Sequence, residues 1–213
     1  MEITPHTMVS YIRWDDPRVE HKDPQEDQYI QKACEQVNQI QQMQFENHHH
    51  CFGATHARTH AIVKGEMQVR PDLPTHLQQS LWSESNRKYP VMVRYSTEPG
   101  DPGLDDRMPQ PRGLGLKIFN VEGNKLGPEG VDMTTQDIEF NNAPALELGN
   151  AKVCTEILGL RINYGTQPDK LKAELQKRPD AEVQQARNKL PNINLAGHRQ
   201  YSQSALRFGD YVA

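Results

Sequence analysis

Period-two alternation of side chains runs through the middle of the chain. Residues 63–69 place small or apolar side chains at every second position, with Lys64, Glu66 and Gln68 between them, which is typical of a half-buried strand. Further short strands are predicted at 91–97, 113–121 and 136–140. We expect these strands to form an antiparallel sheet.

Helical spacing of apolar residues marks the segments on either side of the strands. Asp23 and Pro24 stand where an N-cap and a first helical residue would stand, and apolar residues then recur at helical spacing to about Phe45. Further helices are predicted at 73–83, 144–160 and, weakly amphipathic, 166–190. The fold class that follows is α+β.

Size and charge limit what the chain can be. A chain of 213 residues and 24.3 kDa buries one core, so we expect one domain at 24–213 preceded by an extended N-terminal arm at 1–23. A net charge of -4 argues against nucleic acid as a partner. No apolar run is long enough for a membrane span and no signal peptide is recognisable, so a soluble, intracellular protein located in the cytoplasm is expected.

Three cysteines, Cys34, Cys51 and Cys154, are too few and too scattered for a disulfide framework. We expect reduced thiols. The run of three histidines at 48–50, followed by Cys51, offers the ligand types that zinc prefers. Its contiguous spacing favours a solvated loop over a zinc site, and a metal-binding module remains the weaker alternative.

Four short motifs carry residues suited to peroxide chemistry. A neutral imidazole at His56 could take a proton from one peroxide oxygen and return it to the other. The hydroxyl of Ser96 could fix its tautomer, the amide of Asn142 could polarise the second oxygen, and Arg94 could pair with an anionic group. The motifs are His56-Ala57-Arg58-Thr59-His60, Arg94-Tyr95-Ser96-Thr97, Pro111-Arg112-Gly113 and Asn141-Asn142-Ala143-Pro144.

Each of these residues also has an ordinary structural interpretation. A single histidine before a strand is more often a hydrogen-bonded structural residue than a catalyst, and Arg94 on a strand face is more often a member of a surface ion pair. Asn142, which precedes an Ala-Pro pair, could be a turn residue. The order and spacing of all four motifs together favour the chemical interpretation.

From Thr55 to Pro144 the chain resembles the catalase-like family, including its small catalase-related members. The resemblance implies an antiparallel β-barrel with surrounding helices, here a partial one whose C-terminal part is missing. It implies haem b as cofactor, His56, Ser96 and Asn142 as the catalytic residues, and a peroxide as substrate. Arg94, Arg58 and Arg112 are the candidates for binding the cofactor.

The chain departs from the family pattern at three places. Gly53 stands where the family usually has an arginine, and Cys154 falls near the position of a phenylalanine that stacks on the haem. The family's proximal tyrosine, which ligates iron, lies downstream of the matched region. Arg207 and Tyr211 have the spacing of the family's Arg-x-x-x-Tyr motif, which makes Tyr211 the candidate axial ligand.

The sequence therefore predicts a haem-dependent oxidoreductase acting on hydrogen peroxide or an organic peroxide, or a related enzyme that oxidises a small molecule in a biosynthetic pathway. The alternative is a non-catalytic, truncated catalase-like protein that acts through subunit contacts. A partial barrel would leave apolar surface exposed, and such surface usually marks an interface. We therefore expect a homo-oligomer.

Overall fold

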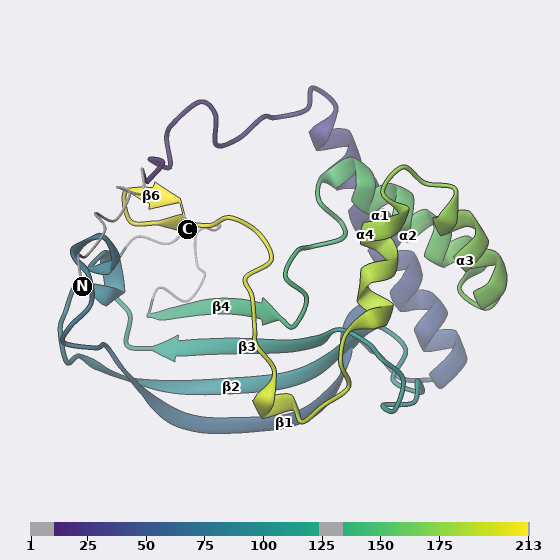
Figure 1. Cartoon of the computed structure of the whole chain (residues 1–213). Helices are drawn as coiled ribbons and strands as arrows, with labels where there is room; N and C mark the ends of the chain where they lie inside the picture. Colours follow the sequence, from purple (N-terminus) through teal and green to yellow (C-terminus); the bar gives the residue numbers. More distant parts are fainter. Residues whose placement is uncertain (1–10, 124–133, 213) are drawn as a thin grey trace, which may run out of the picture.

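Four antiparallel strands form the central sheet of the computed structural model, which describes residues 11–123 and 134–212. The strands lie in chain order (Figure 1). They are β1 (Thr55–Gln68), β2 (Lys88–Pro99), β3 (Arg112–Phe119) and β4 (Thr135–Asn141). The predicted antiparallel sheet is confirmed. Over the described residues it is open, with β1 and β4 as its edges, so closure into a barrel is not confirmed.

The first strand is twice as long as its sequence pattern predicts. β1 begins at Thr55, and its pairing with β2 runs from Thr55 opposite Pro99 to Gln68 opposite Lys88. The register shifts on either side of Arg58, between Thr55 and Arg58 and again between Thr59 and Ala61. Such irregularities redirect side chains locally, and this one lies within the motif that carries the predicted catalytic histidine.

A small apolar core lies at one end of the sheet. Its fully buried members are Val69, Tyr89, Ile118 and Val121. Of two three-residue 3₁₀ turns, η1 (Thr75–Leu77) and η2 (Ser80–Trp82), the second packs against this core through Leu81 and Trp82. The single helix predicted at 73–83 is wrong, because Ser80 has a left-handed backbone (φ 48°) that interrupts helical geometry.

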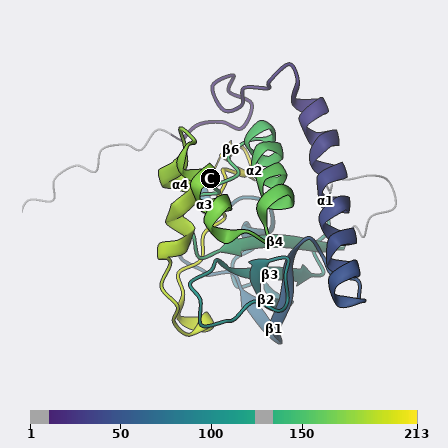
Figure 2. The same ribbon diagram turned by 90° about the vertical axis from the view of Figure 1, so that its right-hand side faces the viewer.

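Two long helices pair beside the other end of the sheet (Figure 2). The predicted N-terminal helix is confirmed as α1 (Glu26–His48), and it packs against α2 (Ala151–Tyr164). No residue of α1 is buried, and a half-open apolar groove of about 380 Å³ runs between the helices, with Cys34 and Cys154 in its wall. The start predicted for the second helix, Pro144, is wrong because the side chain of Asn150 caps the helix by accepting from Val153 N.

The last helical region is divided in two. α3 (Pro168–Gln176) and α4 (Ala181–Ala186) replace the single helix predicted at 166–190. Pro179 accounts for the break, because proline has no backbone donor and disfavours helical geometry at the residue before it. Two further 3₁₀ turns follow, η3 (Arg187–Lys189) and η4 (Leu195–Gly197).

The two ends of the described chain meet over the core end of the sheet (Figure 1). β5 (Arg207–Phe208) and β6 (Tyr211–Val212) form a short hairpin, and the segment around Arg13 runs along β6. Part of the arm predicted at 1–23 lies outside the described residues. No helix among the described residues is long and apolar enough to cross a membrane.

Candidate functional site

The predicted proton-transfer residue lies at the start of β1 and contacts the predicted serine. His56 Nδ1 is 2.9 Å from Ser96 Oγ, and Ser96 is only 3% exposed. The backbone of His56 is left-handed, with a φ of 49°, in a region that few non-glycine residues adopt. This unusual backbone and the hydroxyl contact together fix the position of the imidazole.

A glycine on the neighbouring strand makes room for the imidazole. A Cβ atom at Gly113 would lie 2.5 Å from His56 Cε1 and 2.9 Å from Ser96 Oγ, closer than atoms can approach without moving. By contrast, a Cβ at Gly115, two residues along the same face of β3, would meet nothing within 4 Å. Gly113 is therefore required by the packing of the His56–Ser96 pair.

Burial keeps the imidazole in its neutral form. Desolvation is the main cause that lowers the pKa of His56, and the nearby positive charge of Arg94 lowers it further. The carboxylates of Glu98 and Glu139 oppose this shift of the pKa. A neutral imidazole can accept a proton, which is the first requirement for the predicted role.

Arg94 supports the same histidine through the backbone. Its Nη2 donates to His56 O at 2.6 Å and its Nε donates to Thr59 Oγ1 at 2.9 Å. Arg94 and Ser96 are two residues apart on β2 and therefore share a face of the sheet. The structure thus brings together three predicted residues, His56, Ser96 and Arg94.

Arg112 lies on the opposite face. Ser96 and Thr97 are consecutive on β2 and point to opposite sides of the sheet. Arg112, 3% exposed, donates from Nη1 to Thr97 Oγ1 at 2.6 Å and from Nη2 to Asp106 O at 2.7 Å and Asn192 Oδ1 at 3.1 Å. Its guanidinium is therefore used in holding two loops together and is turned away from His56.

Arg58 joins the same group of residues. Its Nη1 lies 3.0 Å from Asp106 Oδ2 and donates to Leu104 O. His60, two residues later, lies 2.5 Å from Thr97 Oγ1 through Nε2. We call the set of Arg58, His60, Thr97, Asp106, Arg112 and Asn192 the Asp106 network. Asp106 and Asn192 were not predicted, because neither the 98–111 loop nor residue 192 carries a sequence signal for an ion-pair centre.

Asn142 follows the last residue of β4 and is held on both sides of its amide. Its Oδ1 accepts from Arg112 N at 2.8 Å, and its Nδ2 lies 3.4 Å from His198 Nδ1. His198 Nε2 lies 3.2 Å from Ile193 O, and since a carbonyl only accepts, Nε2 carries the proton and Nδ1 accepts from Asn142. His198 thus fixes the orientation of the predicted asparagine.

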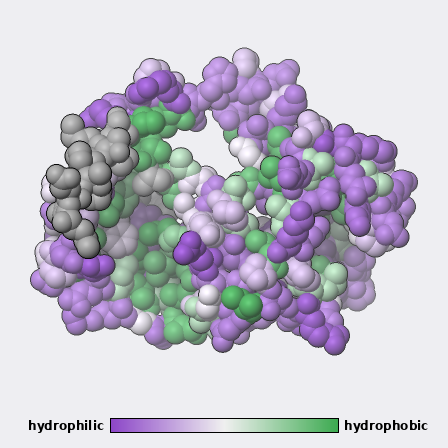
Figure 3. Space-filling view, in the orientation of Figure 1, coloured by the Kyte–Doolittle hydropathy of each residue, from purple (hydrophilic) through white to green (hydrophobic). Residues whose placement is uncertain are grey.

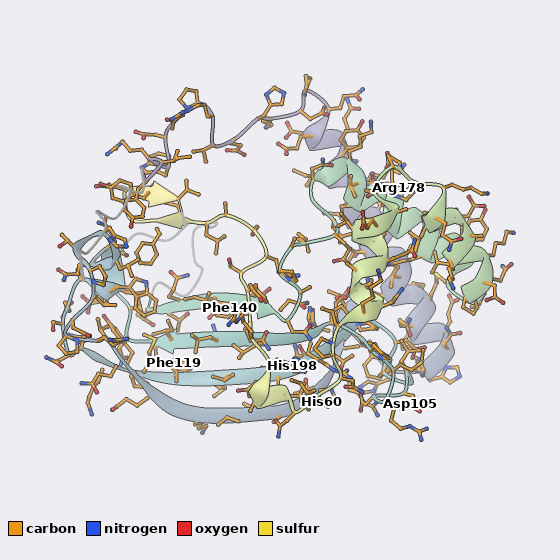
Figure 4. The ribbon with its side chains drawn as sticks, in the orientation of Figure 1. His60, Asp105, Phe119, Phe140, Arg178 and His198 are labelled. Carbon is orange, nitrogen blue, oxygen red and sulfur yellow. The ribbon has the colours of Figure 1, made fainter. Side chains whose placement is uncertain are left out.

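Tyr211 does not lie with the other predicted residues. It belongs to the hairpin whose Phe208 stacks on Trp82, with ring centroids 6.5 Å apart, and Trp82 covers the apolar core. Figure 4 shows His60 and Asp105 at one end of the sheet and Phe119, beside that core, at the other. Within one chain, the structure places Tyr211 at the end of the sheet away from His56.

Four charged residues connect the site to the helices. Glu98 and Glu147 alternate with Arg161 and Arg187 in a closed ring of ion pairs, with nitrogen–oxygen distances from 2.7 to 3.7 Å. Glu98 lies near the end of the strand that carries Ser96, and Arg161 lies on α2. This ring, which the sequence analysis did not predict, ties α2 and η3 to the end of the sheet that holds His56.

Three of the predicted site residues meet on one face of the sheet. His56 and Ser96 supply a neutral base with a fixed orientation, and Arg94 supplies a cation on the same face. The other two predicted cation partners, Arg58 and Arg112, are bound to Asp106, and Tyr211 is remote. In the part of the chain that the structure describes, no three His, Cys, Asp or Glu side chains are grouped as metal ligands, so the alternative of a metal-binding module gains no support.

Comparison with known proteins points to one family. No family model matches the chain. Catalase-2 of Caenorhabditis elegans is 32% identical over 64 residues, covering 30% of this chain and 13% of that protein. The catalase of Schizosaccharomyces pombe is 32% identical over 59 residues, covering 28% of this chain and 12% of the relative.

Over part of its length, this chain is similar to catalases. Its matches span about an eighth of the length of these two curated relatives. Among solved structures, catalase A of Saccharomyces cerevisiae aligns with a TM-score of 0.41 and 19% identity, covering 73% of this chain and 27% of that one. A fungal catalase aligns with a TM-score of 0.36 and 19% identity, covering 66% of this chain and 23% of the other.

Proposed function

We propose that this catalase-like chain acts in a peroxide-directed oxidoreductase, with His56 as the group that moves the proton. The observation that carries the proposal is the 2.9 Å contact between His56 Nδ1 and Ser96 Oγ in surroundings that lower the pKa of the imidazole by desolvation. Hydrogen peroxide or an organic peroxide is the substrate class, because cleaving either requires a proton to pass between adjacent oxygens.

His56, Asn142 and Arg94 have different roles in this proposal. With Nδ1 engaged by Ser96, the other ring nitrogen of His56 takes the proton from one peroxide oxygen and returns it to the other. The amide of Asn142, oriented by His198 and by the Arg112 backbone, has one further N–H with which to polarise an oxygen. Arg94 is the cation on the His56 face that can pair with a carboxylate.

Haem b is the cofactor that this proposal names, and when bound it supplies the redox iron that peroxide cleavage requires. His56, Ser96 and Arg94 would lie on its proton-transfer side. The proposed axial ligand is Tyr211, which within one chain lies at the other end of the sheet. Assembly with a second chain would be needed to bring such a ligand to the His56 face.

The test is peroxide turnover and haem absorbance of protein expressed with ample haem. His56→Asn keeps a residue that tolerates the left-handed backbone and should lower turnover by about 100-fold or more. His60→Asn, four residues along on the other face, is the matched control and should leave turnover near the wild-type value. Tyr211→Phe should shift the haem absorbance if Tyr211 is the ligand.

A second candidate function has its own observation. Arg58 and Arg112 are engaged by Asp106, and Tyr211 is distant, which favours a non-catalytic catalase-like protein that acts through subunit contacts. Folded protein that takes up no haem and leaves peroxide unchanged would overturn the first proposal and support this one. Equal turnover in wild type and His56→Asn would remove His56 from the proposal even if haem is bound.

A further inference from the structure

The outer edge of β1 is an unpaired strand of unusual length. β1 is the first strand of the sheet and spans 14 residues, and every residue from Thr59 to Glu66 is exposed. Apart from its pairing with β2, the backbone of β1 bonds no other strand or loop among the described residues. Figure 1 shows β1 as the outermost strand of the described sheet.

Exposed apolar residues lie at the centre of this edge, and the register irregularities of β1 are confined to its first part, before Ala61. Ile62 is 61% exposed and Val63 is 48% exposed, and β1 contains no proline. Figure 3 shows that apolar surface is exposed mainly in the left part of that view and is bordered by hydrophilic residues. Long, exposed, apolar edges are templates for pairing with another strand, so β1 is suited to bind one.

The charges of β1 match those of a second β1 running antiparallel. If Gly65 of one strand lies opposite Gly65 of the other, Lys64 of each strand faces Glu66 of its partner, and Val63 faces Met67. Both cross-strand charge pairs therefore join a lysine to a glutamate. In both apolar pairs Val63 and Met67 are in reach of each other, because residues directly opposite each other lie on the same side of the sheet. Neighbouring registers centred on Lys64 or Glu66 would oppose like charges.

Two further observations favour this register. Lys64 forms no ion pair with any described residue, whereas Glu66 pairs with Lys88 at 2.7 Å on the exposed face. In the paired sheet, Glu66 would lie between Lys88 of its own chain and Lys64 of the other. Gly65 at the centre carries no side chain to hinder the close approach of the two backbones.

We propose that two copies of this chain join through their β1 edges, with Gly65 on the twofold axis, to form one continuous eight-stranded sheet. The partner is a second copy of this chain, because the edge is complementary to itself in charge and in apolar pairing. Such a dimer places the two His56 faces on the same side of one sheet. It also gives the expected homo-oligomer a defined surface.

Charge reversal tests the register. Lys64→Glu creates two carboxylate–carboxylate pairs across the interface, and Glu66→Lys creates two ammonium–ammonium pairs, so each variant alone should weaken the dimer by about tenfold or more. In a one-to-one mixture of the two single variants, one strand is acidic at both positions and the other is basic at both. A mixed dimer in the same register therefore has opposite charges in both pairs, and the mixture should recover dimerisation. The double variant, Lys64→Glu with Glu66→Lys, restores opposite charges at both positions and should restore the dimer.

A matched control separates this interface from the general effect of charge. Lys117→Glu makes the same change of charge on the same face of the sheet, but within β3 and away from the edge. This variant should dimerise as the wild type does. A loss of dimer in Lys117→Glu equal to the loss in Lys64→Glu would mean that overall charge, and not the β1 register, controls association.

The measurement is sedimentation velocity across a concentration series, with circular dichroism to establish that each variant is folded. Loss of the dimer in both single variants and its recovery in the double variant would establish both the surface and the register. A wild type that stays monomeric at every concentration would overturn the proposal and leave the edge to a strand of another protein. Dimers that persist unchanged in both single variants would also overturn it, because they would use a different surface.

Discussion

The two faces of the sheet at its His56 end are built in opposite ways. On one face, His56 has a single side-chain partner, Ser96, and a bare strip of β3 at Gly113 and Gly115 beside it. On the other face, Arg112 is buried and bound to groups from three different segments. A sparse face leaves a group free to react, whereas a densely bonded face fixes loops. The four motifs therefore supply residues to both faces of the sheet: His56 and Ser96 lie on the face proposed to react, and Arg112 lies on the face that holds the loops.

Removing the arginine of the dense face should have the largest effect. Arg112→Met would leave Thr97, Asn192 and the carbonyl of Asp106 without their donor, and we expect a loss of about 3 kcal/mol in the free energy of unfolding. Arg94→Met on the sparse face removes two hydrogen bonds and should cost about 1–2 kcal/mol. Chemical denaturation measures both, and equal losses would contradict the difference between the faces.

Adding one carbon to the sparse face should have the next largest effect. Gly113→Ala forces the His56 ring or the strand to move, and we expect a loss of about 1–3 kcal/mol in stability together with displacement of the imidazole. Gly115→Ala, two residues away on the same face, meets open space and should change stability by less than about 0.5 kcal/mol. Unfolding curves compare the two variants, and a neutral Gly113→Ala would contradict the packing described for His56.

Removing the hydroxyl of Ser96 should have a smaller effect on stability but a specific effect on His56. Ser96→Ala should cost about 1 kcal/mol and change the ratio of the two imidazole tautomers, which nitrogen NMR detects. Thr97→Val, on the next residue and the opposite face, should leave the His56 signals in place. An unchanged tautomer ratio in Ser96→Ala would mean that the hydroxyl does not orient the ring.

The smallest expected effect is the dependence of stability on pH below neutrality. Because desolvation lowers the pKa of His56, the unfolded chain binds this proton more readily, so the stability due to the neutral ring is present above the ordinary histidine pKa and declines as pH falls below it. Glu98→Gln removes a charge that raises the pKa of His56 and should lower this pKa further. Proton NMR of the ring checks the titration, and a pKa above the ordinary histidine range would contradict the burial argument.

The sequence pattern predicted the sheet well and the loops poorly. Alternation located β2 and β3 within a few residues, because one face of each strand is apolar. It also predicted Ser96 as the partner of His56, since the motif spacing set both on neighbouring strands. It could not predict that Arg58 turns to the other face, because the irregular register of β1 decides which side that residue faces and leaves no mark in composition. Arg112 lies on that face because the pairing of β3 with β2 sets it opposite Thr97.

The breaks in the helices have local causes. Pro179 divides α3 from α4, and the capping side chain of Asn150 sets the start of α2. Both are signals in the sequence itself. Asp106 and Asn192 are different, because nothing within the 98–111 loop or around residue 192 indicates that the two meet. Their pairing depends on the path of the whole chain.

The exposure of α1 has a consequence for how the molecule opens. None of its residues is buried, and its main packing partner is α2. Detaching a helix that packs along one side only costs less free energy than unfolding the sheet. Its amide protons should therefore exchange with solvent water through detachment of the helix alone, well before those of β2 and β3. Cys154, which is partly covered in the folded chain, would then become more reactive to alkylating reagents while the sheet stays folded, whereas Cys34 is already exposed.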